Sequence, residues 1–466
     1  MRPEIKEYNF DWMLWTTMET AYKSALGTEK EFRRVLSYIP YFKGILDPIV
    51  SEGEPGVTFL KLAAGYFKNI ITAHEKGKKL AMTTFCFSPA ILYAMDTVPV
   101  TLEILTALAG LTWKRGAFDY LDYCVERGFT ETSCSSQRGS LGAYMAGLGE
   151  EIDFIVIDTG GICDTNANAY SFASAYMDKP FYQLNFPAGL TDERTKAYHR
   201  DDYKALIAFI ESQTGKKLDE DKLRVVLNEM SKQDEIIADL EEMECLVPNP
   251  LPVVYNLFIY AGRFMFGGSP EYTELLTSMA KVVRQNAEAG VSGIRSGQEK
   301  CRAFFFYIDH YTVNLRLWQW LDLHEISHIG GILSRFFSDN VHYTRGREEE
   351  AYRIETGDLE TMIDSIAEMN ARMPMVRSIR GPYDAPYMWL DDALALGKVY
   401  GADCMIYNGT PGCRNTWSNV KLIAKDLEKN GYPTHIMYAD AFDDRVESWE
   451  ATSERLDEFF ELRRLL

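Results

Sequence analysis

The clearest indication of the fold class is the stretch Phe154-Ile155-Val156-Ile157-Asp158-Thr159-Gly160-Gly161-Ile162-Cys163. It begins with four consecutive apolar residues, passes through a glycine pair and leads into a helical pattern that continues to Ala175. A strand that is apolar on both faces is typical of a parallel sheet covered by helices on both sides, whereas a half-exposed strand alternates apolar and polar residues. The stretch therefore predicts an α/β unit of strand, turn and helix.

The same alternation of strand and helix occurs in two regions of the chain. Short apolar runs followed by helical patterns lie at 80–85, 154–157 and 181–186, and again at 329–333, 404–407 and 434–438. Residues 1–75 and 200–300 carry helical patterns instead, and a Gly/Pro interruption lies at 51–56. We therefore expect an α/β protein with an N-terminal helical region (1–77), a first α/β domain (78–199), a helical segment (200–300) and a second α/β domain (301–466). The two α/β halves are candidates for a distant duplication.

Composition and charge limit the classes of function. The chain has 466 residues, 46% hydrophobic and 25% charged, which is typical of a globular protein of about three domains. Its 68 acidic residues exceed its 49 basic ones, giving a net charge of −19, so we expect neither nucleic acid nor a membrane surface as a partner. With no apolar run long enough to cross a bilayer and no signal-peptide pattern, we expect a cytoplasmic protein whose cysteines are reduced.

Three of the eight cysteines stand in a context that favours reactivity. Consecutive cysteines are never closer than nine positions, which excludes sites built on Cys-x-x-Cys. Cys134, Cys163 and Cys413 each lie just ahead of a predicted helix. In a parallel sheet such turns gather at the carboxyl ends of the strands, where ligands bind and where a helix N-terminus favours a thiolate. Soft thiolates without a matching set of histidines favour an iron–sulfur cluster over zinc.

The other cysteines have simpler interpretations. Any one of the three named above, taken singly, also fits a buried core residue, which is a common place for cysteine. Cys86 follows a predicted strand and is either a fourth ligand or a residue lining the same crevice. Cys404 lies within an apolar run and is predicted to be core, whereas the remaining three fall on helical patterns and are predicted to be structural: Cys124, Cys245 and Cys301.

Ordered motifs extend from about residue 80 to the end of the chain. The first is Cys134-x-x-x-Arg138 before a helix, and the second is the apolar run 153–157 leading to Cys163-Asp164. The segment Thr214–Asp219 follows, and the third motif comprises Tyr407-Asn408, Cys413-Arg414, Gly431-Tyr432-Pro433, Asp440, Asp443-Asp444-Arg445 and Arg455. Together these motifs resemble the 2-hydroxyacyl-CoA dehydratase and benzoyl-CoA reductase family.

The resemblance implies two Rossmann-like domains and one [4Fe-4S] cluster held by Cys134, Cys163 and Cys413, with the fourth iron position open to another ligand or the substrate. Family members work as two related subunits and receive electrons from a separate ATP-dependent iron–sulfur activator. In the dehydratases, one electron enters the thioester carbonyl of the acyl-CoA substrate, and the resulting ketyl radical expels the 2-hydroxyl group. The sequence contains no P-loop motif, in agreement with a separate activator.

Two residues are our candidates for catalysis. Ser88 and Glu103 lie where family members place polar active-site groups, although a serine before Pro89 also fits a helix cap. Ile91 stands where many members have glutamate, which leaves open a non-catalytic subunit whose cluster relays electrons to a partner. A subunit of a benzoyl-CoA (aromatic acyl-CoA) reductase is the nearest alternative activity.

A motif of another class is also present. His324-Glu325-Ile326-Ser327-His328 fits the H-E-x-x-H pattern of zinc peptidases, in which two histidines one helical turn apart bind zinc. The glycines at 330 and 331 predict that the helix ends near His324 and that a turn leads into a strand at 329–333. We therefore keep the zinc peptidase as the less favoured alternative and expect a solvated turn or an interface role.

Overall fold

The computed structural model describes residues 30, 34, 47–85, 87–112, 117–147, 151–160, 163–185, 193–306, 315–331, 353–372, 387–409, 411–413 and 417–466. The chain divides into two compact units, which we describe separately. Unit 1 comprises Met1–Gln233, Ala261–Leu275 and Tyr352–Arg372, and unit 2 comprises Asp234–Tyr260, Leu276–Ala351 and Met373–Leu466. The domain boundaries expected from the sequence remain a prediction.

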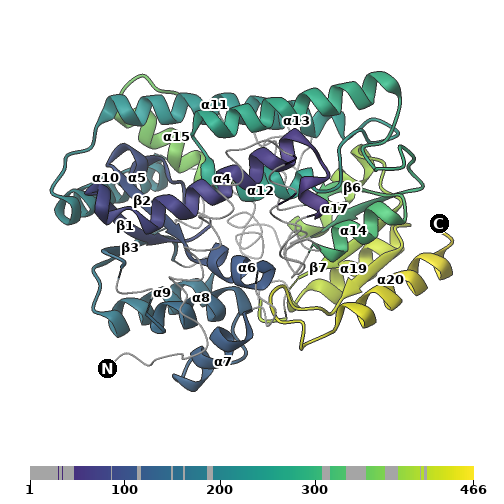
Figure 1. Cartoon of the computed structure of the whole chain (residues 1–466), viewed down its shortest axis with the longest axis horizontal. Helices are drawn as coiled ribbons and strands as arrows, with labels where there is room; N and C mark the ends of the chain where they lie inside the picture. Colours follow the sequence, from purple (N-terminus) through teal and green to yellow (C-terminus); the bar gives the residue numbers. More distant parts are fainter. Residues whose placement is uncertain are drawn as a thin grey trace. The chain divides into compact units, whose positions relative to one another are not determined.

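Unit 1 contains a parallel sheet with the strand order β2-β1-β3-β4, of which Figure 1 labels β1, β2 and β3. Its strands are β1 (Lys79–Thr83), β2 (Thr97–Thr101), β3 (Phe154–Gly160) and β4 (Phe181–Asn185). The side chains of residues 80–82 and 154–157 are buried, as expected for strands covered on both faces. The three strands predicted in the first half of the chain are therefore confirmed.

The sequence analysis does not predict β2. Pro99 stands at its centre and lacks the N–H that a central strand needs. Within the sheet of unit 1, β2 lies at the edge and pairs with β1. An edge strand tolerates a proline because only one of its sides takes part in the ladder.

Helices cover the sheet of unit 1. α4 (Glu54–Ile71) packs on β2 and begins within the predicted Gly/Pro interruption, with a proline in its first turn. α9 (Asp164–Met177) packs on β3, and α10 (Glu193–Thr214) packs on β4 and on α15 (Leu359–Arg372). The other elements of this unit are η1 (His74–Lys76), α5 (Ala90–Ala94), α6 (Leu102–Thr112), α7 (Phe118–Glu126) and α8 (Ser135–Met145).

The predicted helical segment is also confirmed. It contains most of α10 and all of α11 (Glu220–Met243), α12 (Tyr255–Phe266) and α13 (Pro270–Ala289), and the last three have residues in both units. Within the described part of the chain, none of the helices combines the length and the apolar character needed to cross a membrane.

Unit 2 repeats the strand order of unit 1. Its parallel sheet has the order β6-β5-β7-β8. The strands are β5 (Cys301–Phe305), β6 (Ile326–Gly331), β7 (Cys404–Asn408) and β8 (Thr434–Met437), and the helices are α14 (Arg316–Leu323), α17 (Met388–Val399), α19 (Val420–Lys429) and α20 (Trp449–Arg463). In both sheets the first strand in sequence lies between the second and the third. The predicted α/β class with two parallel sheets is confirmed.

The predicted helical placement of two cysteines in unit 2 is wrong. Cys301 was assigned to a helical pattern but is the first residue of β5, where its Sγ lies 4.0 Å from the Sγ of Cys404. Cys245 is exposed in the turn that follows α11 rather than on a helix. Helical and strand patterns are hard to distinguish over such short apolar runs. Cys404 is buried in β7 and Cys124 is buried in α7, as predicted.

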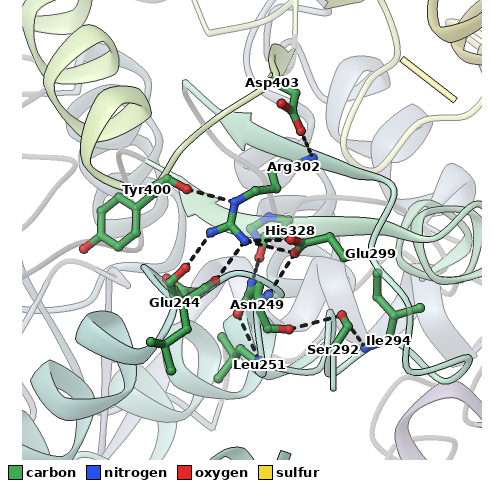
Figure 2. A network of polar contacts seen from close by, with 11 residues as sticks. Glu244, Asn249, Leu251, Ser292, Ile294, Glu299, Arg302, His328, Tyr400 and Asp403 are labelled. Atoms are coloured by element: carbon green, nitrogen blue, oxygen red, sulfur yellow. Dashed lines mark hydrogen bonds and ion pairs between the residues drawn. The ribbon is translucent and has the colours of Figure 1, made fainter. Parts of the chain in front are cut away.

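Arg302 of β5 ties the segment after α11 to the sheet of unit 2 (Figure 2). Its guanidinium donates to the carbonyl oxygens of Glu244, Leu246 and Tyr400 at 2.7, 3.0 and 2.9 Å. It also donates to Glu299 Oε1 at 2.9 Å, and both side chains of this ion pair are 5% exposed. A buried guanidinium is tolerated only when its charge is paired and its donors are satisfied. This network therefore fixes the amino-terminal end of the sheet.

Candidate active site at the turn cysteines

Cys134 and Cys163 each begin a helix of unit 1. Cys134 is the N-cap residue of α8 and Cys163 that of α9. The carbonyl oxygen of Cys134 accepts from the Arg138 N–H at 3.1 Å, and that of Cys163 accepts from the Ala167 N–H at 3.0 Å. Neither side chain makes a capping hydrogen bond. The predicted positions of both residues, each just ahead of a helix, are therefore confirmed.

Cys413 of unit 2 shares the backbone hydrogen bond of this arrangement. It follows β7, and its carbonyl oxygen accepts from the N–H of Trp417 at 3.0 Å. β7 is the third strand of its sheet, as β3 is in unit 1, so Cys163 and Cys413 follow equivalent strands. We refer to Cys134, Cys163 and Cys413 as the turn cysteines, and all three are partly exposed.

Cys124 and Cys404 are buried, unlike the partly exposed turn cysteines, and their thiol pKa values are raised. Burial raises the pKa of Cys124 to about 12. The pKa of Cys404 is raised well above its ordinary value, first by its contact with Cys301 and then by burial. A thiol of this kind stays protonated and is a poor metal ligand. A helix N-terminus, in contrast, favours a negative charge, so Cys134 and Cys163 are the better candidates for thiolates.

Glu103 connects the helices that begin at Cys134 and Cys163. It follows β2 as the second residue of α6 and is 2% exposed. Its Oε2 accepts from the Phe85 N–H at 3.2 Å, and its Oε1 accepts from Gln137 Nε2 at 3.1 Å and from Asn166 Nδ2 at 3.4 Å. Gln137 and Asn166 each stand three residues after a turn cysteine, in the first turn of α8 and α9 respectively.

This connection gives Glu103 unusual acid–base properties. Burial raises the pKa of its carboxyl group from 4.5 to about 7, although the hydrogen bonds from Phe85, Gln137 and Asn166 oppose the rise. At neutral pH the group is therefore poised between its protonated and ionised forms, as an acid–base catalyst should be. The prediction that Glu103 is catalytic is not tested by these contacts.

Close packing fixes α8 in place. A Cβ added at Gly142 would lie 2.0 Å from the carbonyl oxygen of Tyr120 in α7, and one added at Gly139 would lie 2.5 Å from Thr106 Cγ2 in α6. Thr106 Oγ1 also hydrogen-bonds the carbonyl oxygen of Ser136 at 2.5 Å. Only glycine allows such close approach. The position of Cys134 is therefore set by the packing of the whole helix.

Ser88 is buried but does not cap a helix. The N-cap residue of α5 is Pro89, and no side chain caps this helix. Ser88 is 6% exposed. Its hydroxyl oxygen is buried and has no hydrogen-bond partner among the residues that the structure describes. The helix-cap interpretation is therefore wrong, and the hydroxyl remains available to a ligand. Cys86, the candidate fourth ligand, lies outside the described residues.

Sequence reasoning missed three polar residues of this region. Gln137 and Asn166 could have been found from a shared spacing, since both carry an amide three residues after a turn cysteine. Asp158 of β3 is fully buried, accepts from Thr84 Oγ1 at 3.0 Å, and has its pKa raised to about 6 by burial. No local pattern marks Asp158, because it lies inside an otherwise apolar strand.

The predicted three-thiolate site stays a prediction. Cys134 and Cys163 belong to unit 1 and Cys413 to unit 2. Among the residues described, there is no group of three or more His, Cys, Asp or Glu side chains arranged to hold a metal ion.

The zinc-peptidase alternative is wrong. His324 lies at the C-terminal end of α14, and Glu325 has a φ of 60°, so no helix carries both histidines. His328 is buried in β6 and stacks on Phe305, with ring centroids 4.5 Å apart. Its Nδ1 lies 3.0 Å from Asn256 Nδ2 and accepts from the Gly330 N–H at 3.1 Å. His328 is therefore a core residue rather than part of a solvated turn.

Comparison with known proteins identifies the family. The model of 2-hydroxyglutaryl-CoA dehydratase, D-component, matches residues 84–462, a range that includes the turn cysteines, Ser88 and Glu103. The chain is also 22% identical over 412 residues to lactoyl-CoA dehydratase subunit alpha of Anaerotignum propionicum, which covers 83% of this chain and 92% of that protein. The resemblance seen in the cysteine motifs is thereby confirmed, and the chain belongs to the family of 2-hydroxyglutaryl-CoA dehydratase D-components.

Proposed function

We propose that the chain is the [4Fe-4S] subunit of a 2-hydroxyacyl-CoA dehydratase that removes water through a ketyl radical after one-electron activation. The observation that carries the proposal is the shared geometry of the turn cysteines, two of which begin helices joined by the buried Glu103. Membership of the family supports the reaction class. A related second subunit and a separate ATP-dependent iron–sulfur activator complete the proposed system, and the cytoplasm is its proposed location.

The residues present fit such a cluster. Thiolates are the ligands that iron–sulfur clusters use, and three of them would leave one iron for another ligand. Cys134 and Cys163 stand at N-cap positions, where serine, threonine, aspartate and asparagine are preferred, and their side chains contribute no capping bond. Both residues therefore begin their helices through their backbone carbonyl oxygens.

Unsatisfied buried polar atoms on two partners of Glu103 and on Ser88 support a bound ligand. Ser88 Oγ, Gln137 Oε1 and Asn166 Oδ1 are buried and have no hydrogen-bond partner among the described residues. Such atoms destabilise a protein unless a ligand or water satisfies them. Polar groups of an acyl-CoA substrate would meet this need.

Each residue has a proposed role in the reaction. When bound, the cluster supplies the electron for the thioester carbonyl and Lewis acidity. The helix N-termini stabilise the thiolates of Cys134 and Cys163. The Ser88 hydroxyl donates a hydrogen bond to the substrate, and the protonated form of Glu103, about half of the population near neutral pH, gives its proton to the departing 2-hydroxyl group.

The first experiment measures iron and sulfide in anaerobically prepared protein. We expect about four irons per chain in the wild type and loss of the cluster in Cys134→Ala, Cys163→Ala and Cys413→Ala. Cys404→Ala, a buried control, and Cys245→Ala, an exposed control, should keep their iron. Iron-free wild-type protein, or turn-cysteine variants that retain a full cluster, would overturn the proposal.

The second experiment distinguishes the activities. With a partner subunit and a reducing activator supplied, we expect dehydration of a 2-hydroxyacyl-CoA, and we expect Glu103→Gln to lower kcat while the iron content is unchanged. Reduction of an aromatic acyl-CoA instead would support the reductase alternative. An unchanged kcat in Glu103→Gln, with the cluster intact, would support a subunit that only relays electrons.

A further inference from the structure

We propose that unit 1 contains a second ligand site, which binds an amphiphilic organic anion. The site is a cavity of about 560 Å³ between α4, the amino-terminal half of β2 and the turn that joins α12 to α13. This volume lies within the range of small-molecule pockets, which is about 300 to 1,000 Å³. Nothing in the family assignment or in the proposed reaction uses this cavity.

The walls suit an apolar or aromatic body. Leu62 and Tyr66 of α4, Val98 of β2, and Met265 and Phe266 at the end of α12 line the cavity. Phe266 packs edge-on against Tyr66, with ring centroids 6.4 Å apart. Apolar and aromatic walls with a few polar groups are the usual composition of a ligand pocket.

The charges of the cavity suit an anionic head group. Lys61, Lys76 and Lys78 line it, together with the carboxylates of Asp96 and Glu271. The ammonium groups of Lys61 and Lys78 make no hydrogen bond or ion pair with any residue in the described part of the chain. Partly exposed ammonium groups of this kind bind phosphate or carboxylate oxygens without first breaking an ion pair.

The neighbouring lysines neutralise one of the two carboxylates. Asp96 pairs with Lys216 at 3.3 Å and with Lys222 at 3.2 Å, and these hydrogen bonds lower its pKa, although burial opposes them. Three lysines and two carboxylates thus line the cavity, and one of the carboxylates is paired with lysines outside it, in a chain whose net charge is −19. A locally positive cavity in an acidic protein attracts organic anions in particular.

The cavity is distinct from the candidate active site. The residues of β2 that line it are 97–99, at the beginning of the strand, whereas Glu103 follows the end of the strand. Loss of a ligand here should therefore leave the cluster in place. This difference makes the two proposals separately testable.

Gly65 offers a way to close the cavity without disturbing the fold. It lines the cavity from α4, and a Cβ added there meets no atom within 4 Å. Gly65→Leu should therefore fill the space, and Gly65→Ala is the matched control, since it removes the helical glycine without filling the cavity. Both variants should keep or slightly raise the stability, because glycine is a poor residue inside a helix.

Calorimetric titration of the full chain tests the site with two probes, ADP and decanoate. We expect at least one to bind to the wild type and to Gly65→Ala, and to bind about tenfold or more weakly to Gly65→Leu and to Lys61→Gln/Lys78→Gln. Binding of ADP alone would identify a nucleotide, and binding of decanoate alone an acyl anion. Binding of neither probe, or equal binding to Gly65→Leu, would overturn the inference. Iron content should be the same in all four proteins, whatever the fate of the cluster proposal.

Discussion

The buried carboxyl group of Glu103 should make the stability of unit 1 depend on pH. Burial raises its pKa from 4.5 to about 7, so the native protein holds a proton that the unfolded chain releases between these values. A group whose pKa is raised on folding contributes stability that is fully present below the unfolded pKa and is lost as the pH rises through the folded pKa. Glu103 therefore stabilises the fold at pH 5 and no longer does so at pH 8.

The size of the effect follows from the two pKa values. Between pH 5 and pH 8, Glu103 alone should lower the free energy of unfolding by about 2.5 kcal/mol. Glu103→Gln removes this titration but keeps a carbonyl oxygen to accept from Gln137 and Asn166. Its amide meets the Phe85 N–H with a donor in place of an acceptor, which costs about 1 kcal/mol at any pH. The variant should therefore be less stable than the wild type at pH 5 and more stable at pH 8.

Urea unfolding of the full chain at several pH values measures this difference. Other titrating groups, such as Asp158, are present in both proteins, so their effects cancel when the variant is compared with the wild type. Glu75→Gln, which changes an exposed carboxylate of η1, is the control. The difference in the free energy of unfolding between this variant and the wild type should be the same at pH 5 and at pH 8. A stability difference between Glu103→Gln and wild type that stays constant from pH 5 to pH 8 would refute the reasoning.

Three further changes test the packing and the buried charges. Gly142→Ala should destabilise the protein by about 1 to 3 kcal/mol in urea unfolding, because the added Cβ would lie 2.0 Å from the backbone oxygen of Tyr120 and α8 would have to move. Arg302→Met should cost about 3 to 5 kcal/mol in the same assay, because Glu299 is left as an unpaired buried anion, and a smaller loss would indicate that water replaces the guanidinium. Cys124 should stay unmodified by iodoacetamide in the native protein and react only on unfolding, since its pKa is about 12; modification of the native protein would contradict its burial.

The fold was predictable wherever a strand is apolar on both faces. Residues 154–157 form such a run, and β3 is found there. β2 was missed because the proline at 99 argues against a strand unless the edge position is known, and that position depends on the pairing with β1. β5 was missed because Arg302 interrupts its apolar pattern, and the partners that allow an arginine to be buried come from residues 244, 246, 299 and 400. Both failures arise from contacts between distant parts of the chain.

In the candidate site too, local patterns were predictable from the sequence, whereas contacts between distant residues were not. The turn cysteines were found because helix starts have a local signature, and the structure confirms this placement for Cys134 and Cys163. The bridge formed by Glu103 was not predicted, since its three partners lie 18, 34 and 63 residues away. Its near-neutral pKa depends on burial, and the burial of this single carboxylate follows from the packing of α6 rather than from any local motif. Sequence therefore indicates the candidate residues, and packing determines the protonation of Glu103.

The repeated strand order gives the cluster proposal its most demanding test. Cys163 and Cys413 follow the equivalent third strands of the two sheets, and each accepts a hydrogen bond from the N–H four residues later. If both are ligands that also begin a helix, a serine at either position should keep the helix, because serine caps well, while it removes the soft ligand. Cys163→Ser and Cys413→Ser should therefore keep the helical circular dichroism of the wild type and lose iron to a similar extent. If only one of the two variants lost iron while both stayed folded, the two cysteines would not share a metal site. Their equivalent positions would then follow from the repeated strand order alone.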